Sequence, residues 1–339
     1  MNEDVTFSDS EKQPEENENQ QPVEQNELTE ATQPLTWDTA ELMGTSDVDE
    51  TARLEGLPND STGPLETISF IRKKSEPIQE REPILRVAKR CHVGAIRERN
   101  EDSCVVFVSD TGGHFPILPF GLYVVADGMG GHQNGHLASK TASRVVARNI
   151  INRIYMPLLQ EDNNPMQTPI QEVMTDAVQA AHMAIFDPDP EHDGGTTLTA
   201  ALILGRRLYI AHVGDTRIYM RTDEKFEVLT TDHSLVQRLQ DVGQLTAEEA
   251  TFYQYRHILL RALGQGEEIE VDTYMRLLPP TGKLLLCTDG LSGIVSEATM
   301  KEVMGKDIPL QQMADELFEA AMAGGGYDNI TAILVDFNL

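Results

Sequence analysis

Three acidic residues of this chain stand where an apolar run meets glycine, and this arrangement suits the binding of a cation. Asp127 follows the apolar run 124–126 and precedes three glycines within four residues. Asp289 follows a second apolar run, and Asp328 stands between a glycine run and the apolar segment 330–335. Each acid is therefore expected at the end of a buried strand, beside backbone that can turn sharply.

Three carboxylates at one edge of a sheet would repel one another strongly unless a divalent ion neutralised them. Carboxylate and carbonyl oxygens are the ligands that Mg²⁺ and Mn²⁺ prefer. Taken alone, each Asp-Gly pair also fits an ordinary turn in a surface loop. The recurrence of one pattern at three strand ends favours a metal centre over three unrelated turns.

The spacing of apolar residues predicts the elements that would position these acids. Strands are expected at 88–94, 104–108, 120–126, 197–204, 207–213, 217–221, 275–278, 284–288 and 330–335. Helices are expected at 137–151, 168–186, 297–304 and 308–322, with a mostly helical segment at 232–256 that holds a capping box from Thr246 to Glu249. Short turns between strands imply antiparallel hairpins. The pattern predicts an α+β fold of two packed antiparallel sheets flanked by helices.

The first 70 residues differ in composition from the rest of the chain. They hold 18 Asp or Glu against 2 Lys or Arg, which is a net charge of −16 out of −28 for the whole chain. Large apolar residues are few, so this segment cannot bury enough surface to offset its ordering entropy. We expect a disordered acidic tail and linker over residues 1–86 and a single domain over residues 87–339.

Composition also excludes several functional classes. The acidic balance argues against nucleic acid and against an anionic membrane surface as partners. No apolar run approaches the roughly 20 residues that span a bilayer, and the acidic N-terminus is unlike a signal peptide, which favours the cytoplasm. The phosphate-binding glycine motifs of nucleotide-binding proteins are absent. Cys91, Cys104 and Cys287 lack zinc or redox spacing and are expected to be buried free thiols.

Six short motifs occur in a fixed order along the chain. They are Arg97-Glu-Arg-Asn100-Glu101-Asp102-Ser103, Asp127-Gly128-Met129-Gly130, Gly195-Thr196-Thr197, Gly214-Asp215-Thr216-Arg217, Thr288-Asp289-Gly290 and Asp328-Asn329. Together they resemble the metal-dependent serine/threonine protein phosphatases, the PPM or type two C family, in their bacterial form. The resemblance covers roughly residues 88 to 338. It implies a four-layer αββα sandwich, with a mobile flap at 232–256 near the site.

The resemblance assigns a metal ligand set to the acidic residues. It implies that Asp127 bridges two Mn²⁺ or Mg²⁺ ions, with the carbonyl of Gly128 on the second ion. Asp289 and Asp328 would complete the first ion. Asp193 matches the residue that holds a third, weaker ion in bacterial relatives.

The remaining site residues would bind substrate or support the metal ions. Arg97 suits a phosphate, because its planar fork of donors matches two phosphoryl oxygens. Glu101 and Asp102 would act through metal-bound waters, with direct ligation by Asp102 left open, and Asp215 would support its loop or such a water. His132 is open between a general acid for the leaving group and a role in packing the loop.

The implied function is hydrolysis of phosphoserine and phosphothreonine by attack of a metal-activated water. The expected partners are phosphorylated proteins and a bacterial serine/threonine kinase that the enzyme opposes, and the chain is expected to be a monomer. Two alternatives remain: the same chemistry on a small phosphate ester, and a catalytically inactive domain that serves as a scaffold. The retention of Arg97, Asp127, Asp289 and Asp328 speaks against the scaffold.

The acidic tail carries a repeated short motif. Thr32, Thr39, Thr51 and Thr62 each have Leu at the third following position. The hypothesis is that a kinase phosphorylates one or more of them and that a forkhead-associated domain reads the phosphothreonine. The alternative is a solubilising acidic linker in which the spacing arose by chance.

Overall fold

The computed structural model describes residues 84–109, 118–130, 134–160, 168–187, 189 and 194–339. The first strand begins at Ile84, three residues before the expected start of the domain. The division of the chain into tail and domain stays a prediction, because the acidic segment and its four Thr-x-x-Leu motifs lie outside the described residues. His132 and Asp193 lie outside them too.

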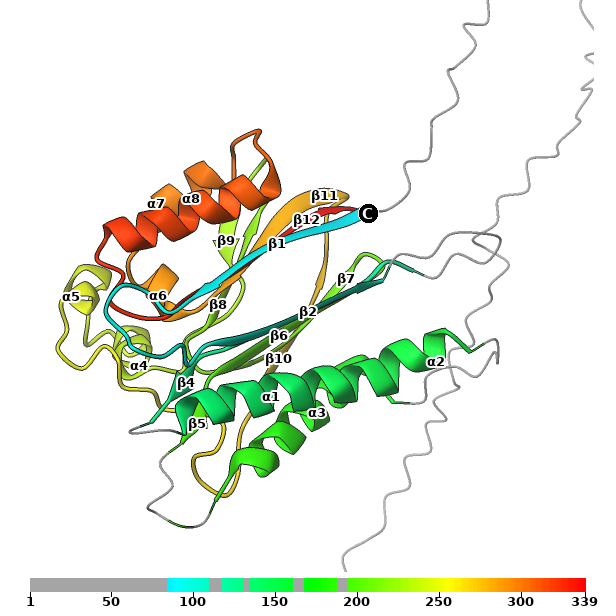
Figure 1. The fold of residues 1–339 in the computed structure, drawn as a ribbon, viewed down its shortest axis with the longest axis horizontal. Helices are drawn as coiled ribbons and strands as arrows, with labels where there is room; N and C mark the ends of the chain where they lie inside the picture. The colour runs from blue at the N-terminus through cyan, green and yellow to red at the C-terminus, as the bar shows by residue number, and fades with distance from the viewer. Residues whose placement is uncertain (1–83, 110–117, 131–133, 161–167, 188, 190–193) are drawn as a thin grey trace, which may run out of the picture. The chain divides into compact units, whose positions relative to one another are not determined.

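The first sheet has five antiparallel strands in the order β1-β12-β11-β8-β9 (Figure 1). They are β1 (Ile84–His92), β12 (Ile330–Asn338), β11 (Thr281–Cys287), β8 (Arg217–Arg221) and β9 (Phe226–Val228). Leu285 of β11 lies opposite both Leu334 of β12 and Tyr219 of β8. β11 and β12 are central and apolar, whereas β1 and β9 form the edges.

The second sheet also has five antiparallel strands, in the order β10-β7-β6-β3-β2. They are β10 (Asp272–Leu277), β7 (Arg207–Val213), β6 (Leu198–Leu204), β3 (Phe120–Ala126) and β2 (Ser103–Ser109). Every residue of β3 is buried, because the strand has neighbours on both sides and is covered on both faces. This explains why its sequence is a continuous apolar run rather than an alternating one. A short ribbon of β4 (Gly128–Met129) and β5 (Gly195–Thr196) extends beyond it.

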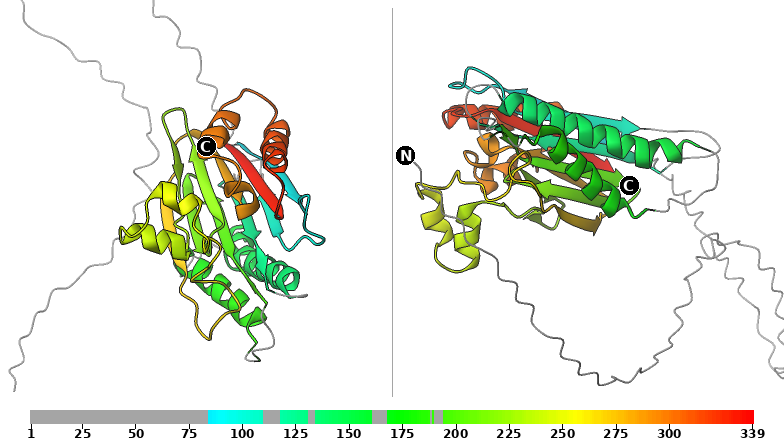
Figure 2. Two further views of the ribbon diagram at one scale, coloured as in Figure 1. Left: turned by 90° about the vertical axis from the view of Figure 1, so that its left-hand side faces the viewer. Right: turned by 90° about the horizontal axis from the view of Figure 1, so that it is seen from below.

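Helices cover the outer face of each sheet (Figure 2). On one side lie α1 (Gly135–Ile150), continued by η2 (Ile151–Tyr155) and α2 (Met156–Leu158), and α3 (Ile170–Ile185). On the other lie α6 (Asp289–Ser292), α7 (Glu297–Val303) and α8 (Leu310–Ala323). The segment between β9 and β10 holds α4 (Leu235–Asp241) and α5 (Ala247–Thr251). The arrangement confirms the predicted four-layer αββα sandwich.

Strand alternation divides the core between the layers. Val124 of β3 packs toward α1 and α3, while its neighbours Tyr123 and Val125 pack between the two sheets. Ile333 and Val335 of β12 meet them there from the other sheet. Burial of each such side chain stabilises the fold by roughly 1.5–3 kcal/mol, so the inter-sheet layer holds the two sheets in a fixed relation.

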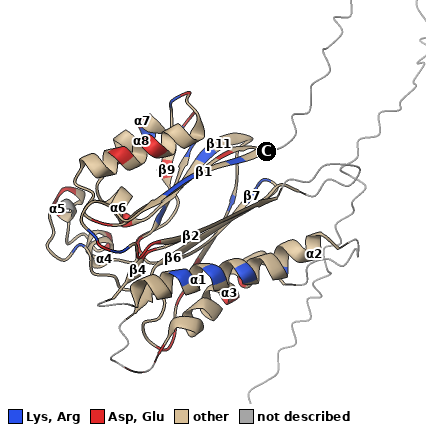
Figure 3. Cartoon of the chain, in the orientation of Figure 1, with Lys and Arg blue, Asp and Glu red and all other residues tan. Residues whose placement is uncertain are grey.

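The sequence of helix α1 has apolar and basic residues at helical spacing on opposite faces. Small and branched apolar residues recur every four positions on its buried face: Ala138, Ala142, Val146 and Ile150. Its outward face carries basic residues at the same spacing, Lys140, Arg144 and Arg148, which give the blue bands along α1 in Figure 3. The helix is thus amphipathic, with its apolar stripe on the sheet.

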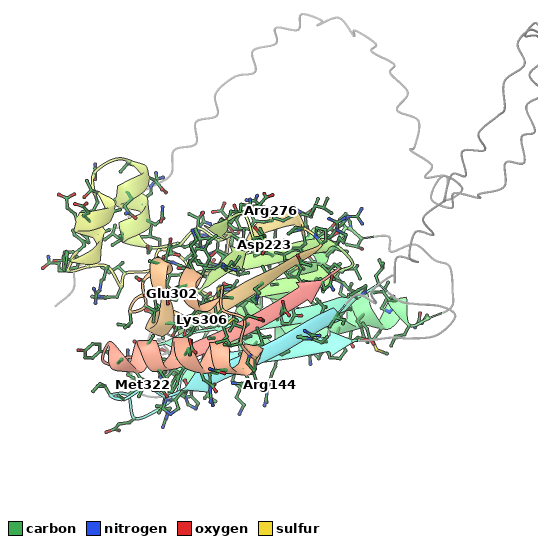
Figure 4. The ribbon with its side chains drawn as sticks, turned by 90° about the horizontal axis from the view of Figure 1, so that it is seen from above. Arg144, Asp223, Arg276, Glu302, Lys306 and Met322 are labelled. Atoms are coloured by element: carbon green, nitrogen blue, oxygen red, sulfur yellow. The ribbon has the colours of Figure 1, made fainter. Side chains whose placement is uncertain are left out.

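Helices α7 and α8 are held together more by buried apolar contacts than by ion pairs. The ammonium of Lys306 lies 2.8 Å from Glu316 of α8 and 4.0 Å from Glu302 of α7 (Figure 4). Such exposed pairs contribute at most about 1 kcal/mol. Met300 of α7 and Leu317 of α8 are fully buried in a common cluster and contribute more.

The sequence predictions differ from the structure in a few elements. The strand expected at 275–278 begins at Asp272, and β9 and the single turn α6 were not predicted. The capping box from Thr246 to Glu249 is confirmed, although the segment around it holds only two short helices. None of the described helices combines the length and the apolarity that crossing a bilayer requires.

The cysteines do not all behave as expected. The prediction of three buried thiols is confirmed for Cys287, met only in part for the half-buried Cys104, and wrong for the exposed Cys91. Cys91 lies on β1, an edge strand with no further strand beside it, and this leaves one side of the residue open. An apolar-looking strand at the edge of a sheet is not covered as a central one is.

Candidate active site

The three predicted strand ends meet at one end of the sandwich. Asp127 follows β3, Asp289 begins α6 directly after β11, and Asp328 shortly precedes β12. There they line a pocket of about 390 Å³. Its wall includes most of the predicted site residues: Arg97, Glu101, Asp127, Gly128, Asp215, Asp289 and Asp328.

The backbone of Asp127 is fixed by the Gly195–Thr197 motif. The Asp127 amide donates to the hydroxyl of Thr197 at 3.0 Å, and the Thr197 amide donates to the Asp127 carbonyl at 2.9 Å. The hydroxyl of Thr196 donates to the same carbonyl at 2.8 Å. With its main-chain groups satisfied, Asp127 has its carboxylate available to the pocket. This role of the two threonines was not predictable from their motif.

Gly128 is required by the close approach of two other segments. Its amide donates to the carbonyl of Glu101 at 3.1 Å. A Cβ at this position would collide with the carbonyl oxygens of Gly135 and Glu101. Glycine therefore lets the Asp127–Gly128 backbone lie against both the start of α1 and the turn that carries Glu101.

The pocket is short of positive charge. Burial raises the pKa of Asp127 well above its usual range, and the charges of Asp102, Asp289, Asp215 and Asp328 raise it further. Burial, together with the charge of Asp328, also raises the pKa of Asp289. Desolvation and like charge both disfavour the ionised carboxylates. A divalent cation would relieve both effects, which fits this donor set to a metal ion.

Asp102 lies behind the pocket wall and is buried. Its Oδ2 accepts from the hydroxyl of Thr288 at 2.9 Å, and the Thr288 hydroxyl in turn accepts from the amide of Thr331 at 3.1 Å. Oδ1 has no hydrogen-bond partner among the described residues. Burial raises the pKa of Asp102 well above its usual range. A buried oxygen in this state fits a bound water or a cation.

Arg97 is paired with one of the predicted metal ligands. Its Nη2 donates to Oδ2 of Asp328 at 2.7 Å, and the guanidinium is half exposed. This hydrogen bond is the main cause that raises the pKa of Arg97, with the charges of Asp328, Glu101 and Asp127 adding to it. Arg97 thus carries a positive charge on the rim of an acidic pocket.

Asn329 is a site residue whose role the sequence does not predict. Its buried side chain accepts from the amide of Glu101 at 2.6 Å and donates to the carbonyls of Val93 and Arg99 at 2.9 and 3.0 Å. These three bonds hold the turn between β1 and β2, which carries Arg97. The only signal in the sequence was its position next to Asp328.

The Gly214–Arg217 motif is mainly structural. Arg217 forms a two-pronged ion pair with Asp232, with Nη2 at 2.6 Å and Nε at 2.9 Å from the carboxylate oxygens. Thr216 is buried and hydrogen-bonds Thr199. The loop held in this way presents Asp215, whose pKa burial and the charge of Asp289 raise to about 8.

The segment between β9 and β10 contributes two residues to the pocket wall. His257 and Leu259 line it, and they come just after the expected flap. Leu259 forms a bridge to Ser234, so the two ends of the segment are tied together. Arg261 anchors the end of the segment to Asp272 at 2.9 Å. His257 had not been singled out from the sequence.

Within the described part of the chain, no three His, Cys, Asp or Glu side chains form a ready-made set of metal ligands. Mg²⁺ and Mn²⁺ keep several waters and need few protein oxygens, so Asp127, Gly128, Asp289 and Asp328 still suit them. The sequence model of the family described as "Protein phosphatase 2C" matches residues 97–334, which is more than two thirds of the chain. The chain belongs to this family.

Two curated relatives show how far the similarity extends. "Serine/threonine phosphatase stp" of Listeria innocua is 38% identical over 247 residues, covering 73% of this chain and 93% of that protein. "Serine/threonine protein phosphatase PstP" of Mycobacterium tuberculosis is 35% identical over 258 residues, covering 75% of this chain and 45% of that longer protein. The resemblance seen in the six motifs is therefore confirmed.

Solved structures confirm the fold. The catalytic domain of PstP in complex with two manganese ions has a TM-score of 0.60 and 35% identity, covering 75% of this chain and 99% of that one. Serine/threonine phosphatase Stp1 from Staphylococcus aureus has a TM-score of 0.63 and 28% identity, covering 75% of this chain and 95% of that one. Dependence on metal ions is general to the family.

Proposed function

We propose that this protein phosphatase hydrolyses phosphoserine and phosphothreonine in proteins. The observation that supports this most directly is the convergence of Asp127, Asp289 and Asp328 with Arg97 on one pocket. The relatives described above carry the name of serine/threonine phosphatases, which supports the same substrate class. The intact set of acidic residues argues against an inactive scaffold.

The metal ions are proposed to be two Mn²⁺ or Mg²⁺ ions. Asp127 would bridge them, the carbonyl of Gly128 would bind the second, and Asp289 and Asp328 would bind the first. When bound, they supply an activated water and neutralise phosphoryl oxygens. Asp193 is proposed as the ligand of a third ion.

The other residues of the pocket have separate tasks. Arg97 stands on the rim and is proposed to bind two phosphoryl oxygens with its planar fork. Asp102 and Glu101 are proposed to accept hydrogen bonds from waters of the metal site. Asp215, on its fixed loop, also lines the pocket and is proposed to do the same. His132 is proposed either to protonate the leaving alkoxide or to pack its loop.

The proposal extends to the surroundings of the enzyme. A bacterial serine/threonine kinase would supply the phosphorylated proteins that this enzyme dephosphorylates, in the cytoplasm, and the enzyme would act as a monomer. Nucleic acid is not proposed as a partner, because the chain has a net charge of −28.

The function is tested by phosphate release from a phosphothreonine peptide and from a small aryl phosphate. Each substrate is assayed with Mn²⁺, with Mg²⁺ and with excess chelator. The proposal expects turnover of the peptide that requires a metal ion. If the aryl phosphate is turned over and the peptide is not, the substrate is instead a small phosphate ester. If neither is turned over, the protein is a scaffold.

The acidic tail is proposed to be a phosphorylation target. A kinase would modify Thr32, Thr39, Thr51 or Thr62, and a forkhead-associated domain would bind the phosphothreonine through the Leu three positions later. Phosphosite mapping of the protein from its native cells tests the first step. Binding of the phosphorylated tail to a forkhead-associated domain of the same organism tests the second, and an unmodified tail would contradict both.

A further inference from the structure

Two thiols meet between the edges of the two sheets. Cys91 lies on β1, the edge of the first sheet, and Cys104 lies on β2, the edge of the second. The two strands run beside each other on one side of the sandwich (Figure 1). Cys104 faces the layer between the sheets. Cys91 faces the same layer, because it lies on the face of β1 that carries Leu85 and Val87, and each thiol shifts the pKa of the other.

Cys91 combines exposure with several hydrogen-bond donors. The side-chain amide (Nδ2) of Asn100 and the hydroxyl of Thr331 each donate to its sulfur at 3.3 Å. These bonds, after the larger effect of the Cys104 thiol, lower the pKa of Cys91 below its usual range. The residue is also exposed at the open edge of β1, which is the side from which an oxidant in solution would approach.

We propose that Cys91 and Cys104 form a reversible disulfide that joins the two sheets beside the metal site. Both side chains face one layer from neighbouring edge strands, so bridging them requires a movement of the two strands and no change of fold. Disulfides that form in reducing compartments are typically transient and redox-sensing. Cys91 is hydrogen-bonded to Asn100 and Thr331, so a bond at its sulfur would act on the neighbours of Asp102.

The reaction needs a hydroperoxide as the oxidant. The Cys91 thiolate attacks one peroxide oxygen, which gives a sulfenic acid on Cys91 and, with hydrogen peroxide, releases water after protonation. Cys104 then gives up its proton and its sulfur attacks the Cys91 sulfur, while the hydroxide that leaves Cys91 takes up a proton and becomes a second water. Two thiols and one hydrogen peroxide become one disulfide and two waters, and a dithiol reverses the step by exchange.

The disulfide would act on the turn that carries the site. Asn100, which donates to Cys91, also accepts from the amide of Asp102 at 3.1 Å. On the other side, Thr331 leads through Thr288 to the carboxylate of Asp102. A sulfur drawn into a bond with Cys104 loses these two donors, so Asp102 is held less firmly. Loss of such supporting bonds weakens metal binding by roughly tenfold or more.

The first experiment maps the disulfide and needs no catalysis. The full-length protein is treated with hydrogen peroxide, its free thiols are counted, and its peptides are analysed by mass spectrometry. We expect three free thiols to fall to one, with Cys91 linked to Cys104 and Cys287 unmodified. The variants Cys91→Ser and Cys104→Ser should form no link. A sulfinic acid on Cys91 with Cys104 still free would overturn the proposal.

The second experiment measures its consequence, which rests on the proposed function of the site. Mn²⁺ affinity is measured by calorimetry before oxidation, after oxidation and after a dithiol. We expect it to fall by roughly tenfold and to recover. Cys91→Ser, which keeps an acceptor for Asn100 and Thr331, should not respond, whereas Cys287→Ser should respond as the unmodified protein does. A mapped disulfide with unchanged affinity would overturn the coupling, and absence of Mn²⁺ binding before oxidation would instead contradict the proposed function.

Discussion

The ion pair between Arg97 and Asp328 joins a residue proposed to bind phosphate to a residue proposed to bind metal. In a pocket that is short of positive charge, the guanidinium neutralises part of the carboxylate cluster. A metal ion on Asp328 would compete with Arg97 for the same carboxylate. If both proposed roles hold, the charge of Arg97 would be shared between the metal site and the substrate.

Arg97→Ala tests this sharing. We expect a rise in KM that exceeds the fall in kcat, because the guanidinium binds the phosphate similarly in the ground and transition states. Mn²⁺ affinity should rise at the same time, because Asp328 loses a competitor. Steady-state kinetics and calorimetry measure the two effects, with Arg97→Lys as the matched control that keeps the charge. Unchanged KM and unchanged Mn²⁺ affinity would show that another cation fills this role.

Asp127→Asn should abolish turnover while the protein stays folded. The bridging charge supports several kcal/mol of stabilisation of the transition state, so a fall of at least about a hundredfold is expected. In excess chelator the variant should have a higher Tm than the original protein, because it removes one of several mutually repelling carboxylates. Scanning calorimetry measures this, and a lower Tm would contradict our view of the cluster.

At the scale of elements, the site depends on how the turn between β1 and β2 is held against the start of β12. Asn329 alone makes three hydrogen bonds to this turn from a buried position. Backbone groups that lose a buried partner cost about 1–3 kcal/mol. A small change at one residue can therefore displace Arg97 and Glu101 together.

Asn329→Ala should lower the free energy of unfolding by about 2–3 kcal/mol and lower both metal affinity and turnover. Urea unfolding measures the stability, and calorimetry measures the affinity for Mn²⁺. Asn149→Ala is a matched control, since that amide makes a single bond to the helix carbonyl of Val145 far from the turn. Loss of stability without loss of metal affinity would show that the turn does not control the site.

The packing of β7 predicts a dependence of stability on pH. His212 is fully buried, accepts from the hydroxyl of Thr199 at 2.8 Å and donates to the carbonyl of Thr231 at 3.0 Å. Burial, with the charge of His233 nearby, lowers its pKa to about 4 from 6.5. Between these values the unfolded chain binds a proton that the folded chain does not, so stability is lost as pH falls from about 6.5 to about 4.

Urea unfolding at pH 7 and at pH 4.5 measures how much stability the original protein and His212→Gln each lose. Over this range the free energy of unfolding of the original protein should fall by on the order of 2 kcal/mol more than that of His212→Gln, because glutamine does not titrate. The exposed His257, changed to Gln, serves as the control and should lose as much as the original protein. An equal loss in His212→Gln would show that His212 does not contribute.

The sequence predicted the position of a residue where that position depends only on the strand to which the residue belongs. The apolar run of β3 and the glycines after Asp127 predicted a strand end with an acid at its tip, and the structure confirms this position. Contacts between segments distant in sequence were not predictable. The bonds of Asn329 to a turn more than 200 residues earlier, the hydroxyl of Thr288 on Asp102 and the exposure of Cys91 depend on which strands lie at the edges.

At the scale of the whole molecule, charge is unevenly distributed. Residues 1–70 hold a net charge of −16, and −12 remains for the rest of the chain. Like charges repel at the range of a Debye length, about 10 Å at moderate salt, so an acidic segment has no general attraction to an acidic domain. Among the described residues, the core and the pocket are formed by residues of the two sheets, their helices and the connecting segments.

Deletion of residues 1–80 should therefore leave the enzyme's action on a small aryl phosphate nearly unchanged. We expect kcat/KM within about twofold of the full chain, which corresponds to a difference of about 0.4 kcal/mol, and an unchanged Mn²⁺ affinity. Both quantities are measured at low and at moderate salt, since any charge-driven contact between tail and domain would be strongest at low salt. A deletion that raises kcat/KM several-fold at low salt and less at moderate salt would show that the tail occupies the pocket, with its acidic residues competing for the metal ions.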